Sequence, residues 1–410
     1  MAEERRISAD RRDDVAHHRT IDTVGQPSWA RGDTSRVRPR NHQAGRAFRN
    51  PFEPDIFRRR SEKTLRIGLL VPFQGADAIW GPSCQYSAVL AAAELNERGG
   101  ILGRQIELLA ADAGGSPEAV VERARQLVEK DGANVLVGVH LSSVRLALSR
   151  EFSGRIPYVF APLYEGGIEG SDVFAIGEVP ERQFSGPARW MMETLKAKRW
   201  FLIGNDYVWP RASHRWMKRF VEENGGEIVG EEYVGIGQEE TGHLVDMIEQ
   251  ANPDVVFQSL VGSECIPFNR TFAERGLAGR ILRFSGAIEE NTLLAIGEEN
   301  TENLYCAAGY FSALQTPENL RFLKRYRDAF GITAPVQGVL SEACYEALQF
   351  LGALAARAGT FWLADLAGAM EGLSFSSARG VTTVRNGVAC GPTFLARADG
   401  AQFEVLQRFG

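Results

Sequence analysis

The sequence predicts an α/β protein of two similar lobes, each built on a parallel sheet that is covered by helices. From Leu65 onward, short apolar runs alternate with amphipathic stretches, which is typical of strands joined by helices. The alternation starts again near Glu178, so a second lobe of similar size is expected to follow the first. The 410 residues are 44% hydrophobic, which is ample for two or three domains.

The first lobe is predicted to open with a buried strand at 65–73, because LRIGLLVPF is apolar almost throughout. An Ala-rich helix at 85–96 is expected to end at Gly99-Gly100, since glycine readily takes the left-handed backbone that closes a helix. The remaining elements expected in this lobe are strands at 105–112, 135–138 and 158–161 and a helix at 144–152.

The second lobe repeats this arrangement. Its expected strands lie at 200–204, 227–234, 254–260 and 281–284, and its expected helices at 181–195, 212–224, 241–250 and 264–275. The chain is then predicted to close with a strand at 304–308, helices at 317–330 and 339–358, and strand-like pieces at 381–384, 391–395 and 403–407.

Residues 1–63 are expected to form a disordered leader, because their low hydrophobicity cannot offset the entropy of ordering them. They hold 15 Lys or Arg against 10 Asp or Glu, whereas the remaining residues hold 31 against 42. A partner-binding arm is the alternative. The leader lacks the apolar core of a secretory signal, so a cytoplasmic protein is expected. A misassigned start codon would instead fit a periplasmic protein.

Composition excludes several classes of protein. An acidic body has no basic face for the phosphates of nucleic acid, so no direct nucleic-acid binding is expected. No run of about 18 apolar residues occurs, so no membrane insertion is expected either. The five cysteines are widely spaced and lack the pattern of a zinc site, and they are interpreted as small core residues.

The motifs of common enzymes are also missing. The sequence has no Gly-Lys pair, no GxGxxG after a strand, no GxSxG and no HExxH. We therefore expect no catalytic residue, no metal site and no cofactor. The acid pairs Glu239-Glu240 and Glu289-Glu290 are interpreted as solvated surface, because adjacent residues rarely face one substrate.

The best candidates for ligand binding follow the strands, because ligands of open α/β sheets settle beyond the carboxyl ends of the strands. In the first lobe these candidates are His140, Ser142 and Ser143, then Phe160 and Tyr164. A serine at a helix start can bind a ligand carbonyl or carboxylate together with free N–H groups. It can equally be a plain helix cap, and that alternative stays open.

In the second lobe the candidates follow the strands at 200–204 and 254–260. Asp206, Tyr207 and Trp209 put a carboxylate and two aromatic rings on one short loop, which is more than a mere connection needs. Gly262 and Ser263 follow the other strand. We interpret both loops as ligand or lobe contacts.

Two segments carry a family resemblance: IGLLVPFQG (67–75) and AAAELNERGGILGRQIELLAAD (91–112). They resemble the type I periplasmic binding fold of the leucine and amide class. Four further segments are most similar to the amide- and urea-binding branch, which includes AmiC-type cytosolic amide sensors and binding proteins of ABC transporters. These segments are LYEGG (163–167), GNDYVWPR (204–211), VVFQSLVGS (255–263) and GYFSALQTPEN (309–319).

The resemblance implies two doubly wound, Rossmann-like lobes with three hinge crossings near Val179, Gly309 and Leu373. The lobe boundaries that follow are 64–179 with 310–372 for the first lobe and 180–309 with 373–410 for the second. By matching position, the resemblance implies that Ser142 binds the ligand and that Tyr164, Asp206 and Tyr207 line the cleft. Trp209 replaces a usual tyrosine and His140 a common aromatic, and Pro162 stands where the amide sensor has a hydroxyl residue.

The function that the resemblance implies is a sensor of small amides or urea-like molecules. Such a sensor closes on its ligand and regulates an antiterminator-type partner that controls amide- or nitrile-degradation genes. The alternative is the substrate-binding subunit of an ABC importer for amides, urea or branched-chain amino acids. An enzyme of amide hydrolysis is not expected, and a homo-oligomer stays open.

Overall fold

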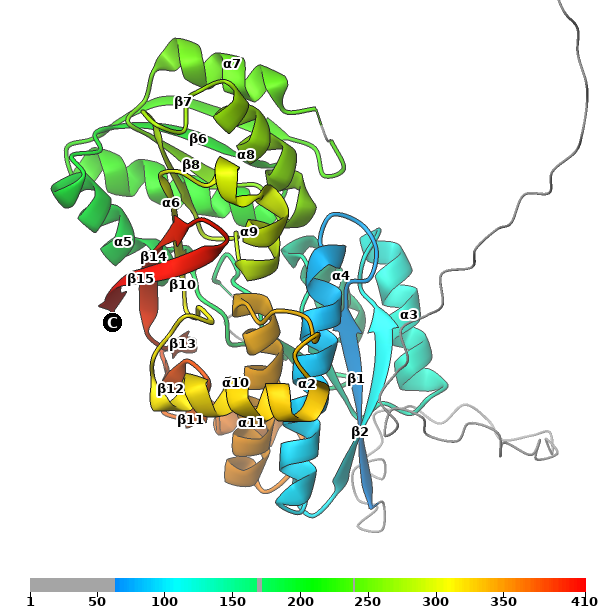
Figure 1. The fold of residues 1–410 in the computed structure, drawn as a ribbon. Coiled ribbons are helices and arrows are strands. Elements are labelled where there is room, and N and C mark those ends of the chain that lie inside the picture. Colours follow the sequence, from blue (N-terminus) through cyan, green and yellow to red (C-terminus); the bar gives the residue numbers. More distant parts are fainter. Residues whose placement is uncertain (1–62, 168–171, 239) are drawn as a thin grey trace, which may run out of the picture. The chain divides into compact units, whose positions relative to one another are not determined.

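A computed structural model describes residues 63–167, 172–238 and 240–410, and it shows an α/β fold with two main sheets (Figure 1). The expected α/β class with two doubly wound lobes is confirmed. No helix in the described residues is long and apolar enough to cross a membrane.

The first lobe contains a parallel sheet of five strands in the order β2-β1-β3-β4-β5. Its first strand is buried on both faces, since Leu65, Ile67, Leu69 and Leu70 are at most 1% exposed. The strands are β1 (Thr64–Val71), β2 (Gln105–Asp112), β3 (Val135–Gly138), β4 (Tyr158–Phe160) and β5 (Val173–Ala175). Its helices are α2 (Gly81–Glu97), α3 (Pro117–Glu129), α4 (Ser142–Phe152), α10 (Pro317–Phe330), α11 (Val339–Ala358) and α12 (Leu363–Gly368), with the short 3-10 helix η3 (Ala78–Trp80) before α2.

The second lobe contains a mixed sheet of seven strands in the order β15-β14-β10-β9-β8-β6-β7. The strands from β6 to β10 are parallel, and β14 and β15 add an antiparallel edge beside β10. The strands are β6 (Arg199–Asn205), β7 (Glu227–Val234), β8 (Val255–Ser259), β9 (Leu282–Ser285), β10 (Leu304–Ala308), β14 (Thr393–Asp399) and β15 (Gln402–Phe409). The helices are α5 (Pro180–Thr194), α6 (Val208–Glu223), α7 (Gly242–Ala251), α8 (Cys265–Glu274) and α9 (Glu290–Ile296), with 3-10 helices η4 (Gly262–Glu264) and η5 (Glu298–Asn300).

A third, antiparallel sheet joins β11 (Ser374–Ser377), β12 (Gly380–Arg385) and β13 (Val388–Cys390). Its first strand lies against α11, and the chain joins the seven-stranded sheet only at Thr393. The lobe boundaries expected from the sequence stay a prediction, to which the structure adds that 374–390 form a sheet of their own.

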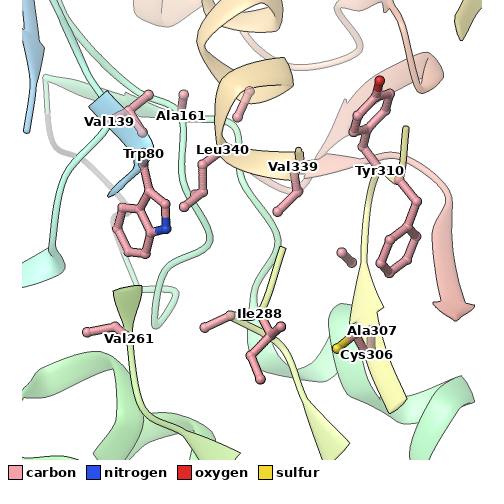
Figure 2. Close-up of a cluster of buried hydrophobic side chains, with 14 of the residues drawn as sticks. Trp80, Val139, Ala161, Val261, Ile288, Cys306, Ala307, Tyr310, Val339 and Leu340 are labelled. Carbon is pink, nitrogen blue, oxygen red and sulfur yellow. The ribbon is translucent and has the colours of Figure 1, made fainter. Parts of the chain in front are cut away.

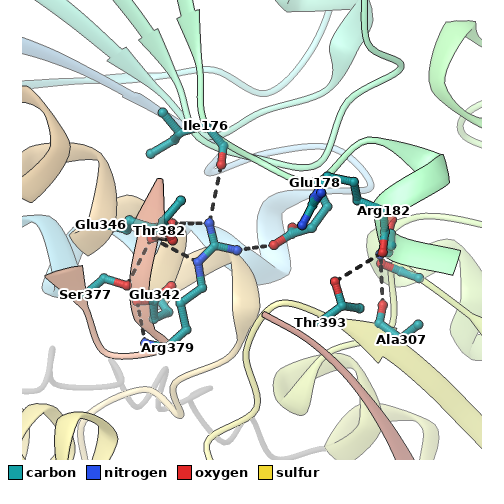
Figure 3. Close-up of polar contacts among 12 residues, drawn as sticks. Ile176, Glu178, Arg182, Ala307, Glu342, Glu346, Ser377, Arg379, Thr382 and Thr393 are labelled. Atoms are coloured by element: carbon teal, nitrogen blue, oxygen red, sulfur yellow. Dashed lines mark hydrogen bonds and ion pairs between the residues drawn. The ribbon is translucent and has the colours of Figure 1, made fainter. Parts of the chain in front are cut away.

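A buried ionic cluster holds together segments on either side of the expected crossings (Figure 3). Arg379 forms an ion pair with Glu178, which lies between β5 and α5, and another with Glu346 of α11 at 2.6 Å. Glu342 of α11 accepts a hydrogen bond from the backbone N–H of Ala378 at 3.0 Å. Gly309, directly after β10, has no room for a Cβ because Glu178 and Arg379 fill that space.

Three carboxylates therefore surround one guanidinium in this cluster. Burial, with the nearby Glu346 charge, raises the pKa of Glu342 to about 8, and burial also raises the pKa of Glu346. Glu342 is thus expected to keep, at neutral pH, a proton that a free carboxyl group would lose. The Arg379 side chain, 4% exposed, is its single cation among the described residues.

We expect Arg379→Met to lower the free energy of unfolding by about 3 to 5 kcal/mol, because it leaves buried carboxylates without their cation. Urea unfolding at pH 7 measures this change. Arg397→Met is the matched control, since the pair of Arg397 with Glu404 is half-exposed on both sides and is worth less than about 1 kcal/mol. Equal losses in the two variants would contradict this role for the cluster.

Candidate ligand-binding site

The two parallel sheets share a topological feature that locates a site. In the order β2-β1-β3-β4-β5 the chain reverses its direction of winding between β1 and β3, and in the second sheet it does so between β6 and β8. Loops diverge at such a switch point beyond the carboxyl ends of the strands and leave a crevice there. Trp80 follows β1, His140 and Ser142 follow β3, Tyr207 follows β6 and Val261 follows β8.

All five residues line one small cavity, so the two switch points face each other. Figure 2 shows Trp80, Val261 and Leu340, three of its lining residues, in a cluster of buried apolar side chains. The cavity volume is about 20 Å³, which is room for one or two water molecules. Its lining consists of Trp80, His140, Leu141, Ser142, Pro162, Leu163, Tyr207, Val261, Ala287, Val339 and Leu340.

His140 contributes a neutral ring to this lining. Its Nδ1 lies 3.1 Å from the carbonyl oxygen of Leu141, and its Nε2 lies 3.0 Å from the hydroxyl of Tyr158. A carbonyl only accepts, so Nδ1 carries the hydrogen and Nε2 accepts from Tyr158. Burial lowers the pKa of His140 to about 4, so the ring is uncharged at neutral pH and both nitrogens are engaged within the protein.

Ser142 is the first residue of α4, and its side chain lines the cavity. The residue before it, Leu141, provides no side-chain cap, so the first N–H groups of α4 have no capping partner of that kind. The positive end of the helix dipole adds to these donors. This end of the cavity is therefore suited to an acceptor such as a carbonyl or carboxylate oxygen.

Trp80 adds another donor. The residue is 5% exposed, and its indole Nε1 is buried without a hydrogen-bond partner in the described structure. A buried N–H without a partner costs about 1 to 3 kcal/mol. Because Trp80 lines the cavity, a bound molecule with an acceptor atom could supply the missing partner.

The second lobe provides the opposite wall. Tyr207 precedes α6, and burial raises the pKa of its hydroxyl well above the usual value, so the group stays protonated. Val261 and Ala287 follow β8 and β9 and are both almost fully buried. A ligand in the cavity would thus contact side chains of both lobes at once.

Charged side chains lie near the cavity but do not line it. Glu165 pairs with Arg145, and Glu264 accepts hydrogen bonds from Asn205 and from the backbone N–H of Gly237. Asp77 is 3% exposed, and burial raises its pKa to about 7. The eleven residues around the cavity include no Asp, Glu, Lys or Arg.

The lobes also touch directly beside the cavity. The backbone N–H of Ser263, in η4, donates to the carbonyl of Ala76 in the first lobe at 2.7 Å. Gly262 has a φ of +55°, and a Cβ there would collide with the same carbonyl of Ala76. A glycine is therefore required for this approach of the two backbones.

The structure brings three of the ten candidate residues to the cavity: His140, Ser142 and Tyr207. Ser143 is the next residue of α4 and is half-buried, and Gly262 and Ser263 form the contact with Ala76.

The other four candidates lie away from the lining. Phe160 packs behind it, with its ring 5.3 Å from that of His140, and Tyr164 is buried in the same core. Trp209 is buried in the core around the second sheet, and Asp206 is exposed, where it pairs with Arg211 at 2.5 Å.

Sequence reasoning missed several lining residues. Trp80 follows the first strand as His140 follows β3, so the rule that drew attention to strand exits could have found it. Val339 and Leu340 open α11, far along the chain from the other lining residues, and no local motif marks them. Among the described residues, no group of three or more His, Cys, Asp or Glu is placed to hold a metal ion.

The expectation that Glu289 and Glu290 lie on a solvated surface is wrong. Both are buried, at 2% and 5% exposure, because the unexpected helix α9 begins here and Glu289 caps it by accepting from the N–H of Thr292 at 3.1 Å. Glu240 is exposed as expected, and Glu239 lies outside the described residues.

The buried carboxylate of Glu290 has only part of its hydrogen-bonding capacity filled in the described structure. One of its oxygens accepts from the N–H of Ser312 at 2.6 Å, and the other has no partner in the described structure. Burial, with the neighbouring Glu289, raises the pKa of Glu290 to about 8. The neighbouring Asn291 donates to the carbonyl of Val336 at 3.2 Å, just before α11, so this helix start contacts the first lobe.

The sequence model of the periplasmic binding proteins matches residues 64–402. The chain belongs to this family. An amino acid binding protein of Pseudomonas aeruginosa is 25% identical over 237 residues, which are 56% of this chain and less than two thirds (63%) of that protein. A Leu/Ile/Val-binding protein homologue of Brucella abortus is 23% identical, over 65% of this chain and 72% of its own length.

Solved structures agree on the fold. A solute-binding protein of an ABC transporter from Rhodopseudomonas palustris, in complex with 3,4-dihydroxybenzoic acid, has a TM-score of 0.76 at 21% identity and covers 85% of this chain and 98% of its own. The isoleucine complex of a branched-chain amino acid transporter binding protein from Streptococcus pneumoniae has a TM-score of 0.75 at 18% identity, covering 84% and 99%. The names of these relatives describe binding proteins for amino acids and other solutes.

We expect the stability of the protein to fall as the pH rises from 5.5 to 8.5, in part through Glu290. The folded state keeps a proton on Glu290 up to about pH 8, whereas the unfolded chain loses it near pH 4 to 5, so folding binds a proton in this window. Glu290→Gln should therefore reduce the fall in unfolding free energy by at least about 1 kcal/mol.

Urea unfolding at several pH values tests this expectation. Asp77 and Glu342, whose pKa values are also raised, leave a residual slope in the variant. Glu240→Gln, at an exposed position, is the control and should keep the full slope. A slope that is the same in Glu290→Gln and in the unmodified protein would contradict the assignment.

Proposed function

We propose that this protein is the solute-binding subunit of an ABC importer and encloses a small organic molecule between its two lobes. The observation that carries the proposal is the cavity at the two facing switch points, with lining residues from both lobes. The relatives named above as amino acid binding and ABC transporter binding proteins support the transport role.

Closure of the lobes follows from the position of the cavity. A ligand shifts a conformational equilibrium only by its different affinities for the two states. Here a ligand gains contacts with Ser142 and Trp80 on one lobe and Tyr207 and Val261 on the other only when the lobes are close together. The backbone contact of Ser263 with Ala76 is already formed in this structure, where the cavity holds only one or two water molecules, so the lining side chains must move apart to admit an organic ligand.

The amide sensor is the second candidate, and its support is the motif similarity in segments such as GNDYVWPR (204–211). It implies a cytoplasmic protein with an antiterminator-type partner, whereas an importer subunit works outside the cytoplasmic membrane. Cell fractionation separates the two candidates. Protein in the periplasm supports the importer, and protein in the cytoplasm that co-purifies with a regulatory partner supports the sensor.

Calorimetry with the full-length protein tests ligand capture itself. A suitable panel contains butyramide, urea, leucine, 4-methylpentanoate and benzoate. A ligand of four heavy atoms gains at most about 6 kcal/mol, so dissociation constants of tens of micromolar are expected for the smallest compounds. Absence of binding across this panel and a wider screen of small solutes would contradict the proposed function.

We expect Gly262→Ala to weaken binding of any panel ligand at least tenfold, or by about 1.4 kcal/mol. The new methyl group meets the carbonyl of Ala76 only when the lobes approach, so closure is opposed. Gly242→Ala is the control, because a Cβ at Gly242 meets no atom within 4 Å. Calorimetry of both variants should show the loss in the first alone, and unchanged affinity in Gly262→Ala would contradict closure at this contact.

A further inference from the structure

The cavity offers hydrogen-bond donors on one side and hydrocarbon on most of the rest. The donors are the indole N–H of Trp80, the hydroxyl of Ser142 and the first N–H groups of α4. Two observations therefore indicate an acceptor on the ligand: a helix of eleven residues without a side-chain cap, and a buried indole N–H without a partner. The apolar part of the lining is Leu141, Pro162, Leu163, Val261, Ala287, Val339 and Leu340.

An ammonium group would find no counter-charge in this lining. A buried charge is costly unless it is paired, and no carboxylate is among the eleven lining residues. Glu165 and Glu264 are already engaged by Arg145, Asn205 and Gly237. Asp77 is the nearest alternative, since it precedes η3 and its charge acts on Tyr207, yet it is not part of the lining.

We propose that Trp80 is a specificity-determining residue whose indole N–H binds the carboxylate of an apolar monocarboxylic acid, and that the cavity rejects the same acid when it carries an α-ammonium group. This inference rests on the proposed function and names its ligand class. The carboxylate lies between Trp80 Nε1 and the start of α4 at Ser142, and the hydrocarbon part lies against Val261 and Leu340. Binding of α-amino acids, which the names of some relatives state for those proteins, is then excluded for this one.

Matched pairs of ligands test the selectivity directly on the unmodified full-length protein. Each pair is an amino acid and the same acid without its amino group: alanine and propanoate, valine and 3-methylbutanoate, leucine and 4-methylpentanoate. The corresponding amides form a third arm. We expect the acid of the best-fitting size to bind at least tenfold more tightly than its amino acid.

Each other outcome of this comparison has a definite meaning. An amino acid that binds as tightly as its acid would overturn the inference and leave ligand capture intact. Tighter binding of an amide or of urea would overturn the carboxylate assignment in the same way. Binding of no compound of any kind would contradict the proposed function itself.

Trp80→Phe tests the donor, because it keeps an aromatic ring and removes the indole N–H. We expect at least a tenfold loss of affinity for the acid. Trp209→Phe is the matched control, since Trp209 is also fully buried with an unpartnered Nε1 but does not line the cavity, and its affinity should change less than twofold. Equal losses in both variants would overturn the role of Trp80.

The variant Asp77→Asn tests whether an ammonium group of the ligand pairs with Asp77. If an ammonium group reached Asp77, this variant would lose affinity for leucine or valine, and the inference would be wrong. We expect the affinity for the acid to change less than twofold. Thermal melting of each variant without ligand shows whether it is folded, and the ligand pairs on the unmodified protein decide the matter even where a variant does not fold.

Discussion

The site depends on one geometric constraint: two parallel sheets present the carboxyl ends of their strands to the same small space. Parallel strands place every exit loop at one edge, and the reversal of winding makes two of those loops diverge. In this chain the divergence occurs between β1 and β3 and between β6 and β8, and residues beyond all four strands line the cavity. The strand order thus determines where the cavity lies.

The buried cluster around Arg379 joins segments of the chain that lead into both main sheets. Glu178 lies where the chain passes from β5 to α5, Gly309 follows β10, and Arg379 lies in the turn between β11 and β12 of the small sheet. A single guanidinium therefore contacts segments that lead into both main sheets (Figure 3). Ion pairs at this position fix how these segments lie beside one another.

Much of this architecture could be predicted from the sequence, because strand and helix periods are local. The continuous apolar run at 65–73 identified β1, and the strand exits identified His140, Ser142 and Tyr207. The size of Trp209 and the charge of Asp206 predict a ligand contact on a loop, but helix α6 begins at Val208 and turns Trp209 into the core. Val339 and Leu340 reach the cavity through tertiary packing, which no local pattern reports.

The acid pair at Glu289 and Glu290 is a second case in which local sequence does not predict whether a residue is buried. Adjacent carboxylates normally prefer water, so an exposed position was the reasonable expectation. The structure buries them because Glu289 caps α9 and Glu290 accepts from Ser312. Local composition cannot indicate such an arrangement, since its partners come from α9 itself and from the segment after β10.

The lining of the cavity contains no Asp, Glu, Lys or Arg, and the nearby Glu165 and Glu264 are engaged by other residues. A crystal structure of the full-length protein with 4-methylpentanoate tests this most directly. We expect the carboxylate within hydrogen-bond distance of Trp80 Nε1 and the α4 start, with the lobes closed over the hydrocarbon. A molecule bound elsewhere, for example in the groove beside Arg182 and Arg385, or oriented with its carboxylate away from Trp80, would contradict the account.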